Sequence, residues 1–233
     1  MKFNKIESVA YDKGYSIDVN GDGTFATIIS GYSGIVIAKI VLDNDKIADY
    51  MDEATKQGKD LEATLMAIGV AKEGIALTLN INPVTTIAAY KAGVVINPNP
   101  ITTVTVTDVA NANTAVGDAF GLKDIITSPV IATIKVDGTY QTPNDYGLIL
   151  SILSGLDKVN NGNINTTIQQ ILNQINAGKL TSEGEIKLID GAVNSGISIS
   201  DLTKIVSSDT ILKVKAAAIA KIAAYADDSV NNP

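Results

Sequence analysis

Ile35-Val36-Ile37-Ala38-Lys39-Ile40-Val41-Leu42 is the stretch of sequence that indicates the fold most directly. It is nearly all apolar and most of its residues are β-branched, which is typical of a strand that is covered on both faces of a sheet. A turn of sequence Ser-Gly-Tyr-Ser-Gly precedes it at residues 30–34. The stretch therefore predicts a buried β-strand over residues 35–42.

The residues before this strand predict a β-hairpin. Residues 15–19 alternate apolar and polar side chains, residues 20–23 read Asn-Gly-Asp-Gly, and residues 24–29 return as a second strand. Asn-Gly between two such runs is a strong hairpin signal, because both residues accept the backbone angles of a tight turn. Residues 2–9 are compatible with a further strand, so the first part of the chain predicts a small sheet.

The pattern changes from strands to helices after residue 82. Residues 43–60 are acidic and compatible with a helix, and residues 66–70 and 75–81 predict another pair of strands. Beyond them, capping signals recur before runs with helical spacing, at Thr142-Pro143, at residues 166–169 and again at 182 and 198; the last helix is expected from about residue 209 to residue 225. Strands first and helices later predict an α+β chain.

The composition excludes several classes of chemistry. The chain of 233 residues has no Cys, His, Trp or Arg, so thiol nucleophiles, Cys/His zinc sites and Ser-His devices are ruled out. A net charge of −7 disfavours nucleic acid and anionic membranes as partners. No apolar run approaches the length of a transmembrane helix, so we expect no membrane insertion. We also expect that the protein is not an enzyme.

The polar composition favours an extracellular location. Asn, Thr, Ser and Asp far outnumber Glu, and they favour turns, caps and strands over long charged helices. No apolar signal segment follows the first residues of the chain. A mature or excised chain, a cytosolic protein and a protein exported by a C-terminal signal are all compatible with this absence. We interpret the polar composition as that of a secreted protein of the cell surface.

Several short motifs resemble a known family. The pattern of residues 23–41, with Gly23-Thr24-Phe25, Gly31 and Gly34-Ile35-Val36, resembles the immunoglobulin-like (Ig-like) module of the carboxypeptidase-regulatory type, which recurs in large secreted bacterial surface proteins. The following stretches look like the helical continuation of such modules: residues 79–86, 111–116, 119–122 and 140–157. The resemblance spans roughly residues 15–175 and implies no catalytic residue.

The resemblance and the strand pattern together predict two domains. Residues 1–81 are expected to form an Ig-like antiparallel β-sandwich, and residues 82–233 an all-α helical domain. The expected function is that of a non-enzymatic extracellular structural or adhesion module of a bacterial surface. The alternative is a self-assembling fibre or surface-layer subunit, and a carbohydrate-active enzyme that uses Asp and Glu is a third reading.

One oxygen-rich turn is a candidate calcium site. Asp18, Asn20 and Asp22 alternate before Gly23, as the first ligands of a calcium loop do. The twelfth position of such a loop holds a bidentate Glu, whereas here it is Ile29. The alternative reading is a plain hairpin turn. If calcium binds, these three residues are its expected ligands.

Two further polar groups have structural alternatives. Residues 157–163 are rich in oxygen ligands, but they also fit the end of one helix and the cap of the next. The acidic residues 43–60 could hold a glycosidase-like acid pair, although such a run is usually a solvated face and no aromatic sugar platform accompanies it.

The strand count predicts a site of assembly. About four strands precede the acidic segment, whereas an Ig-like sandwich needs about seven. A neighbouring chain can complete the sheet by strand addition, and the donor expected for this is residues 2–9, with Phe3, Ile6 and Val9 as its apolar contacts. In the competing reading, residues 66–70 and 75–81 complete the sandwich within one chain. The expected partner is thus protein, either a second copy or a neighbouring surface module.

Overall fold

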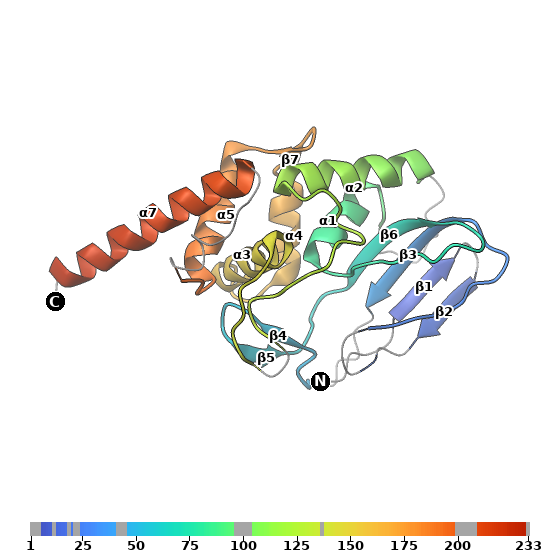
Figure 1. The fold of residues 1–233 in the computed structure, drawn as a ribbon, viewed down its shortest axis with the longest axis horizontal. Coiled ribbons are helices and arrows are strands. Elements are labelled where there is room, and N and C mark those ends of the chain that lie inside the picture. Colours follow the sequence, from blue (N-terminus) through green and yellow to red (C-terminus); the bar gives the residue numbers. More distant parts are fainter. Residues whose placement is uncertain are drawn as a thin grey trace. The chain divides into compact units, whose positions relative to one another are not determined.

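The computed structural model describes residues 6–10, 13–17, 20, 24–40, 46–95, 104–135, 138–198 and 209–231. In these residues the protein is a mixture of helices and small antiparallel sheets (Figure 1). The expected combination of strands early and helices late in the chain is confirmed. A sandwich of two packed sheets is not seen in the part of the chain that is described.

The main sheet has the order β2-β1-β3-β6. Its strands are β1 (Ile6–Ala10), β2 (Lys13–Ile17), β3 (Gly34–Ile40) and β6 (Leu65–Ala71), and every pair is antiparallel. The strand expected over residues 66–70 is therefore confirmed, and so is the strand expected over residues 35–42 as far as residue 40; residues 41 and 42 lie outside the described residues. The two strands pair directly with each other, with Ile37 opposite Ile68.

Apolar side chains cover both faces of the β3–β6 pair, as the β-branched sequence of β3 predicts. On one face, Ile37, Met66 and Ile68 share a core with Ala89 and Val109 from the helices of the same part of the chain. The opposite face is covered at Gly69, where a Cβ atom would lie 2.7 Å from Leu79 Cδ2. The β3–β6 pair is therefore covered on both faces, although β6 is the last strand of the sheet.

The strand expected over residues 75–81 is not formed. After a bridge between Lys72 and Ile75, the chain crosses the sheet as an irregular segment. Asn80 explains the difference, because its backbone N–H donates to Ile126 O (2.8 Å) and its Nδ2 to Ser128 O (2.8 Å). These bonds join the segment to a loop rather than to a ladder.

The strand expected over residues 24–29 is also absent. The Asn20 N–H donates to Thr24 O (2.8 Å), which agrees with a turn at this point. The residues that follow form no strand, and Ala26, Thr27 and Ile28 are exposed. Without a core face to bury, alternation alone does not hold a strand in place.

The acidic segment forms a hairpin rather than a helix in its described residues. Strands β4 (Tyr50–Asp52) and β5 (Gln57–Lys59) pair with each other. The turn between them places Lys56 at φ 57°, and its N–H donates to Asp52 O (2.8 Å). We call residues 52–57 the hairpin tip.

Two compact units make up the chain. Unit 1 lies within residues 1–51, 58–117 and 123–128, and unit 2 within residues 52–57, 118–122 and 129–233. The helix that follows residue 82 belongs to the same unit as the sheet. The expected domain boundary between residues 81 and 82 is therefore not confirmed.

Unit 1 contains the main sheet, α1 (Pro83–Lys91) and residues 106–117 of α2 (Val106–Phe120). The start of α1 follows from the sequence Asn82-Pro83. Asn82 Oδ1 accepts the N–H groups of Val84 and Thr85, and Thr85 Oγ1 accepts the N–H of Asn82 (3.0 Å), which completes a capping box. This cap sets where the irregular segment ends and α1 begins.

Unit 2 consists mainly of α3 (Asp145–Val159), α4 (Ile164–Leu172), α5 (Ser182–Asn194) and α7 (Asp209–Asn231). Helices α3 and α5 approach each other closely at Gly155, where a Cβ atom would lie 2.0 Å from Gly191 O. Unit 2 is not all α, because β7 (Ile175–Asn176) and β8 (Lys179–Leu180) form a short hairpin.

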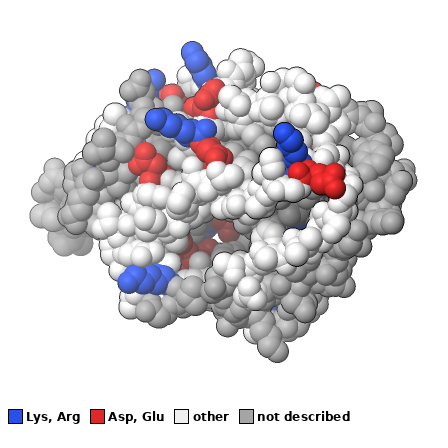
Figure 2. All heavy atoms as spheres, turned by 45° about the vertical axis from the view of Figure 1, so that its right-hand side comes forward, with Lys and Arg blue, Asp and Glu red and all other residues white. Residues whose placement is uncertain are grey.

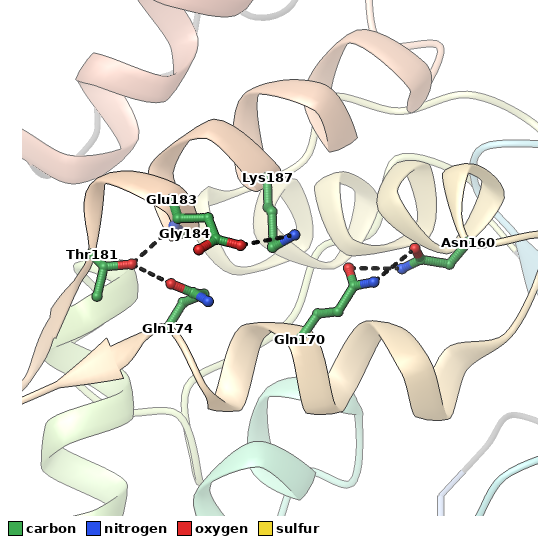
Figure 3. A network of polar contacts seen from close by, with 7 residues as sticks. All are labelled: Asn160, Gln170, Gln174, Thr181, Glu183, Gly184 and Lys187. Atoms are coloured by element: carbon green, nitrogen blue, oxygen red, sulfur yellow. Dashed lines mark hydrogen bonds and ion pairs between the residues drawn. The ribbon is translucent and has the colours of Figure 1, made fainter.

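Polar side chains fasten the ends of these helices (Figure 3). Asn160, the C-cap residue that follows α3, and Gln170 on α4 exchange hydrogen bonds through their side-chain amides (3.3 and 3.2 Å). Thr181 caps α5 by accepting the Gly184 N–H (3.1 Å), and its hydroxyl donates to Gln174. Asn163 caps α4. The oxygen-rich residues 157–163 are thus the end of one helix and the cap of the next.

Candidate functional site

The two edges of the main sheet differ in how their backbone groups are bonded. At β6, side chains from α1 occupy the outer edge: the Met66 N–H donates to Thr86 Oγ1 (2.8 Å), and Thr85 Oγ1 donates to Met66 O (2.8 Å). Both threonines are fully buried. The two threonine hydroxyls thus make the hydrogen bonds to Met66 that the backbone of a neighbouring strand would otherwise make.

A third side chain continues this closure along β6. Asn113 of α2 donates through Nδ2 to Ile68 O (3.1 Å). Its Oδ1 is buried without a hydrogen-bond partner among the described residues. Because the backbone of β6 is bonded by side chains at two successive outward positions, this edge is closed to strand addition.

Strand β2 lies at the opposite edge of the sheet. It pairs with β1 on one side, from Ile6 opposite Ile17 to Ala10 opposite Lys13. On its other side no strand follows in the part of the chain that the structure describes. An open edge presents a row of N–H and C=O groups, which is a template for another β-segment.

The residues expected to donate a strand lie inside the sheet or outside the described chain. Ile6 and Val9 belong to β1, which is paired on both sides, with Val9 opposite Gly14 of β2 and Ile37 of β3. Phe3 lies outside the described residues. Donation to a neighbour would require β1 to leave its own sheet, and the donor role of these residues stays a prediction.

The candidate calcium ligands are only partly described. Asp18 and Asp22 lie outside the described residues. Asn20 is exposed and its Nδ2 donates to Thr24 Oγ1 (3.0 Å). No group of three or more metal-binding side chains occurs among the described residues. Calcium binding therefore stays a prediction.

The acidic hairpin uses its carboxylates to hold backbone in place. Asp49 Oδ2 accepts the Leu61 N–H (2.8 Å), and Asp52 Oδ1 accepts both the N–H and the hydroxyl of Thr55 (2.7 Å each). Both aspartates are buried. The expectation of a solvated acidic face is wrong for these residues, and Asp43 and Asp45 lie outside the described part.

Glu53 is a buried carboxyl group in the hairpin tip. Its Oε1 accepts the Thr133 N–H (2.7 Å). Burial raises the pKa of Glu53, while hydrogen bonds from Thr133, Ile134 and Ser151 act in the opposite direction without cancelling it. A carboxyl group with a raised pKa next to a serine is a pattern also found in active sites. Here, however, Ser151 is fully buried within α3, where a substrate has no access.

The distribution of charge and the hydropathy of the helices can be compared with the expected partners. On the face drawn in Figure 2, charged side chains of both signs lie scattered on a largely uncharged described surface. Within the described residues, no helix has the length and apolar character that crossing a bilayer requires.

The sequence alone did not identify the residues that distinguish the two edges. Thr85 and Thr86 follow Asn82-Pro83, where the pattern predicts only a helix start, and Asn113 lies in an ordinary amphipathic run. Two adjacent threonines inside a helix are unfavourable unless their hydroxyls are used. The adjacent pair Thr85-Thr86 is therefore the feature of the sequence that could have indicated hydroxyl groups bonded to a strand.

Comparison of the chain with protein-family models, with curated proteins and with solved structures found no match.

Proposed function

We propose that this protein is a non-enzymatic structural module of a bacterial cell surface that serves adhesion and joins other chains by strand addition at β2. The observation that supports this most is the difference between the two edges of the main sheet. Side chains of α1 and α2 bond the outward backbone groups of β6, whereas β2 has no such cover among the described residues.

The use of the polar side chains supports a structural role. Asp49 and Asp52 bond backbone amides, and Ser154 Oγ accepts the Ala54 N–H (3.0 Å). Groups that are already bonded to the backbone and buried are poor nucleophiles and bases. The extracellular location rests on the composition and on the resemblance described above.

A second copy of the chain is the partner that we propose for β2. The strand reads Lys-Gly-Tyr-Ser-Ile and carries a single charged residue, Lys13, in a chain with a net charge of −7. Two copies paired antiparallel about Tyr15 place Lys13 opposite Ile17, so like charges do not meet along the edge. This corresponds to a self-assembling surface subunit.

A pair of proline variants in β2 tests this proposal. Along an antiparallel strand, successive N–H groups point to opposite neighbours. Of Tyr15→Pro and Ser16→Pro, one therefore removes a bond to β1, and the other removes only a group at the open edge. We expect the proline variant that removes only the open-edge N–H to keep the circular dichroism spectrum of the fold and to lose self-association in sedimentation velocity. The proline variant that removes a bond to β1 is expected to disturb the fold.

Ser16→Ala is the matched control, because it keeps the backbone N–H; it should associate as the unmodified chain does. The proposal is contradicted if the unmodified chain stays monomeric from micromolar to millimolar concentration. It is equally contradicted if the proline variant that keeps its fold associates normally.

A further inference from the structure

The two edges of the main sheet also determine how far assembly through this sheet proceeds. If β2 of one copy paired with β6 of the next, every added copy would present a new edge, and the contact would repeat into an open fibre. If β2 instead pairs with β2 of a second copy, both copies use the same edge and none is left for a third. The state of β6 therefore decides between a fibre and a closed pair.

Strand β6 is closed by groups that an incoming strand cannot replace without moving a helix. Thr86 Oγ1 accepts the Met66 N–H (2.8 Å), and Thr85 Oγ1 donates to Met66 O (2.8 Å). Asn113 Nδ2 of α2 donates to Ile68 O (3.1 Å). Because both threonines are fully buried, a strand reaches the Met66 backbone only if α1 leaves the sheet. A head-to-tail contact between β2 and β6 is therefore disfavoured.

Strand β2 is suited to pair with a second copy of itself. Its five residues, Lys13–Ile17, have Tyr15 at their centre. In an antiparallel strand, the N–H and C=O groups that point to one side belong to every second residue, so those at the open edge come either from residues 13, 15 and 17 or from residues 14 and 16. An antiparallel register centred on Tyr15 places each of these sets opposite itself. All outward groups of the strand are then paired, whereas a shifted register leaves some without a partner inside the strand.

The helices of unit 1 leave space for this pairing. Ala89 of α1 and Val109 of α2 share a core with Ile37 of β3 and with Met66 and Ile68 of β6. Strands β1 and β2 lie between this core and the open edge. In a β2–β2 pair, the order β3-β1-β2-β2-β1-β3 separates the two β3 strands by five strand spacings, about 24 Å. Since a helix has a diameter of about 10–12 Å, α1 and α2 of the two copies do not collide.

We infer that the protein forms a closed two-fold dimer through β2, in which the two four-stranded sheets join into one sheet that ends at β6 on both sides. This inference rests on the strand addition proposed above and defines its partner surface, which is β2 of the second copy in the antiparallel register centred on Tyr15. Assembly through the main sheet stops at two copies, because the outer strand of each copy is the one that α1 and α2 close.

Sedimentation equilibrium of the unmodified chain tests where assembly stops. From micromolar to millimolar concentration, we expect the average mass to rise from that of the 24.3 kDa monomer to twice this value and no further. A mass that rises beyond the dimer overturns the inference; if the β2 proline variant that keeps its fold abolishes this growth, strand addition at β2 still stands. A chain that remains monomeric contradicts both the inference and the proposed function.

Cysteine variants of β2 test the register of the pair, because the chain has no cysteine of its own. In the register centred on Tyr15, Lys13 lies opposite Ile17 of the second copy, whereas the two copies of Lys13 are four residues apart along the strands, roughly 13 Å. The Cα atoms of a disulfide lie within about 7 Å of each other. Under oxidising conditions we therefore expect an equimolar mixture of Lys13→Cys and Ile17→Cys to form a covalent heterodimer, and each variant alone to form almost none.

Tyr15→Cys is the positive control, since residue 15 lies opposite itself in this register and should cross-link alone. Cross-linking of Lys13→Cys alone that equals that of the mixture indicates parallel or shifted strands and overturns the two-fold register. A mixture without heterodimer, while Tyr15→Cys still cross-links, overturns the register as well but leaves strand addition at β2 in place. Failure of all these samples to cross-link, Tyr15→Cys included, contradicts the proposed function itself.

Discussion

The hydroxyl groups of Thr85 and Thr86, at the start of α1, provide the hydrogen bonds of the Met66 backbone at the outer edge of β6. Thr86 Oγ1 accepts the Met66 N–H and also donates to Asn82 O (2.8 Å), while Thr85 serves both Met66 O and the helix cap. Each hydroxyl therefore bonds a strand and a helix end. This double use explains why both residues are buried although they are polar.

Replacing Thr86 with valine keeps the shape of the side chain and removes its hydroxyl. The Met66 N–H then loses its acceptor inside the core, so we expect a loss of about 1–3 kcal/mol in the free energy of unfolding. Urea unfolding with an unchanged slope measures this. The control is Thr107→Val, at an exposed position of α2, which should stay within about 0.5 kcal/mol. Equal midpoints for the two variants would contradict the role of Thr86.

At the same scale, the sequence predicts helix starts better than the residue that caps them. Capping signals led to Thr142, Thr166 and Ser182, whereas Asn144, Asn163 and Thr181 are the caps in the structure. At Asn144 the reason is tertiary: its side chain accepts the Ile131 N–H (3.1 Å) and donates to Pro129 O (2.8 Å) as well as capping α3. Local patterns carry no information about such bonds.

Among the elements, the packing of α3 against α5 depends on the absence of side chains. Gly155 and Gly191 face the backbone of the opposite helix, where a Cβ atom on either would lie 2.0 and 2.3 Å from a carbonyl oxygen. Glycine weakens a helix by about 1 kcal/mol relative to alanine. Close approach of the two helices offsets this cost through the buried contacts of Ile152 and Leu156.

Gly155→Ala tests this packing. Alanine favours the helix by about 1 kcal/mol, but the overlap with Gly191 O forces the helices apart. We expect the overlap to dominate, with a net loss of about 1–3 kcal/mol and a lower melting temperature. Lys158→Ala, at an exposed site on the same helix, is the control. A melting temperature equal to or above that of the unmodified chain would show that the helices separate without cost.

The sequence predicts the elements of the sheet only where burial agrees with the local pattern. Residues 34–40 and 65–71 are strands because apolar neighbours cover them on both faces. Residues 24–29 have an equally good alternating pattern, yet they form no strand, since Ala26 and Ile28 have no core to enter. Contacts with residues far away in the sequence thus decide whether a segment of high strand propensity forms a strand.

At the scale of the whole molecule, the edges of the sheet are what sequence reasoning could not reach. The bonds that close β6 join Met66 to residues 85 and 86, and Ile68 to Asn113, which lies 45 positions further along the chain. No periodicity reports such a pairing. The early strands and later helices, by contrast, follow from patterns within single segments. The central claim is accordingly that one edge is closed and the other available.

Cysteine cross-linking tests this claim most directly, because the chain contains no cysteine of its own. Tyr15→Cys places a thiol at the middle of β2, and Val70→Cys places one on β6 at a side chain that is 38% exposed. Opposite residues of an antiparallel pair lie close enough for a disulfide. Under oxidising conditions we predict a concentration-dependent covalent dimer for Tyr15→Cys and none for Val70→Cys. Equal cross-linking at the two edges, or cross-linking at Val70→Cys alone, would contradict the account.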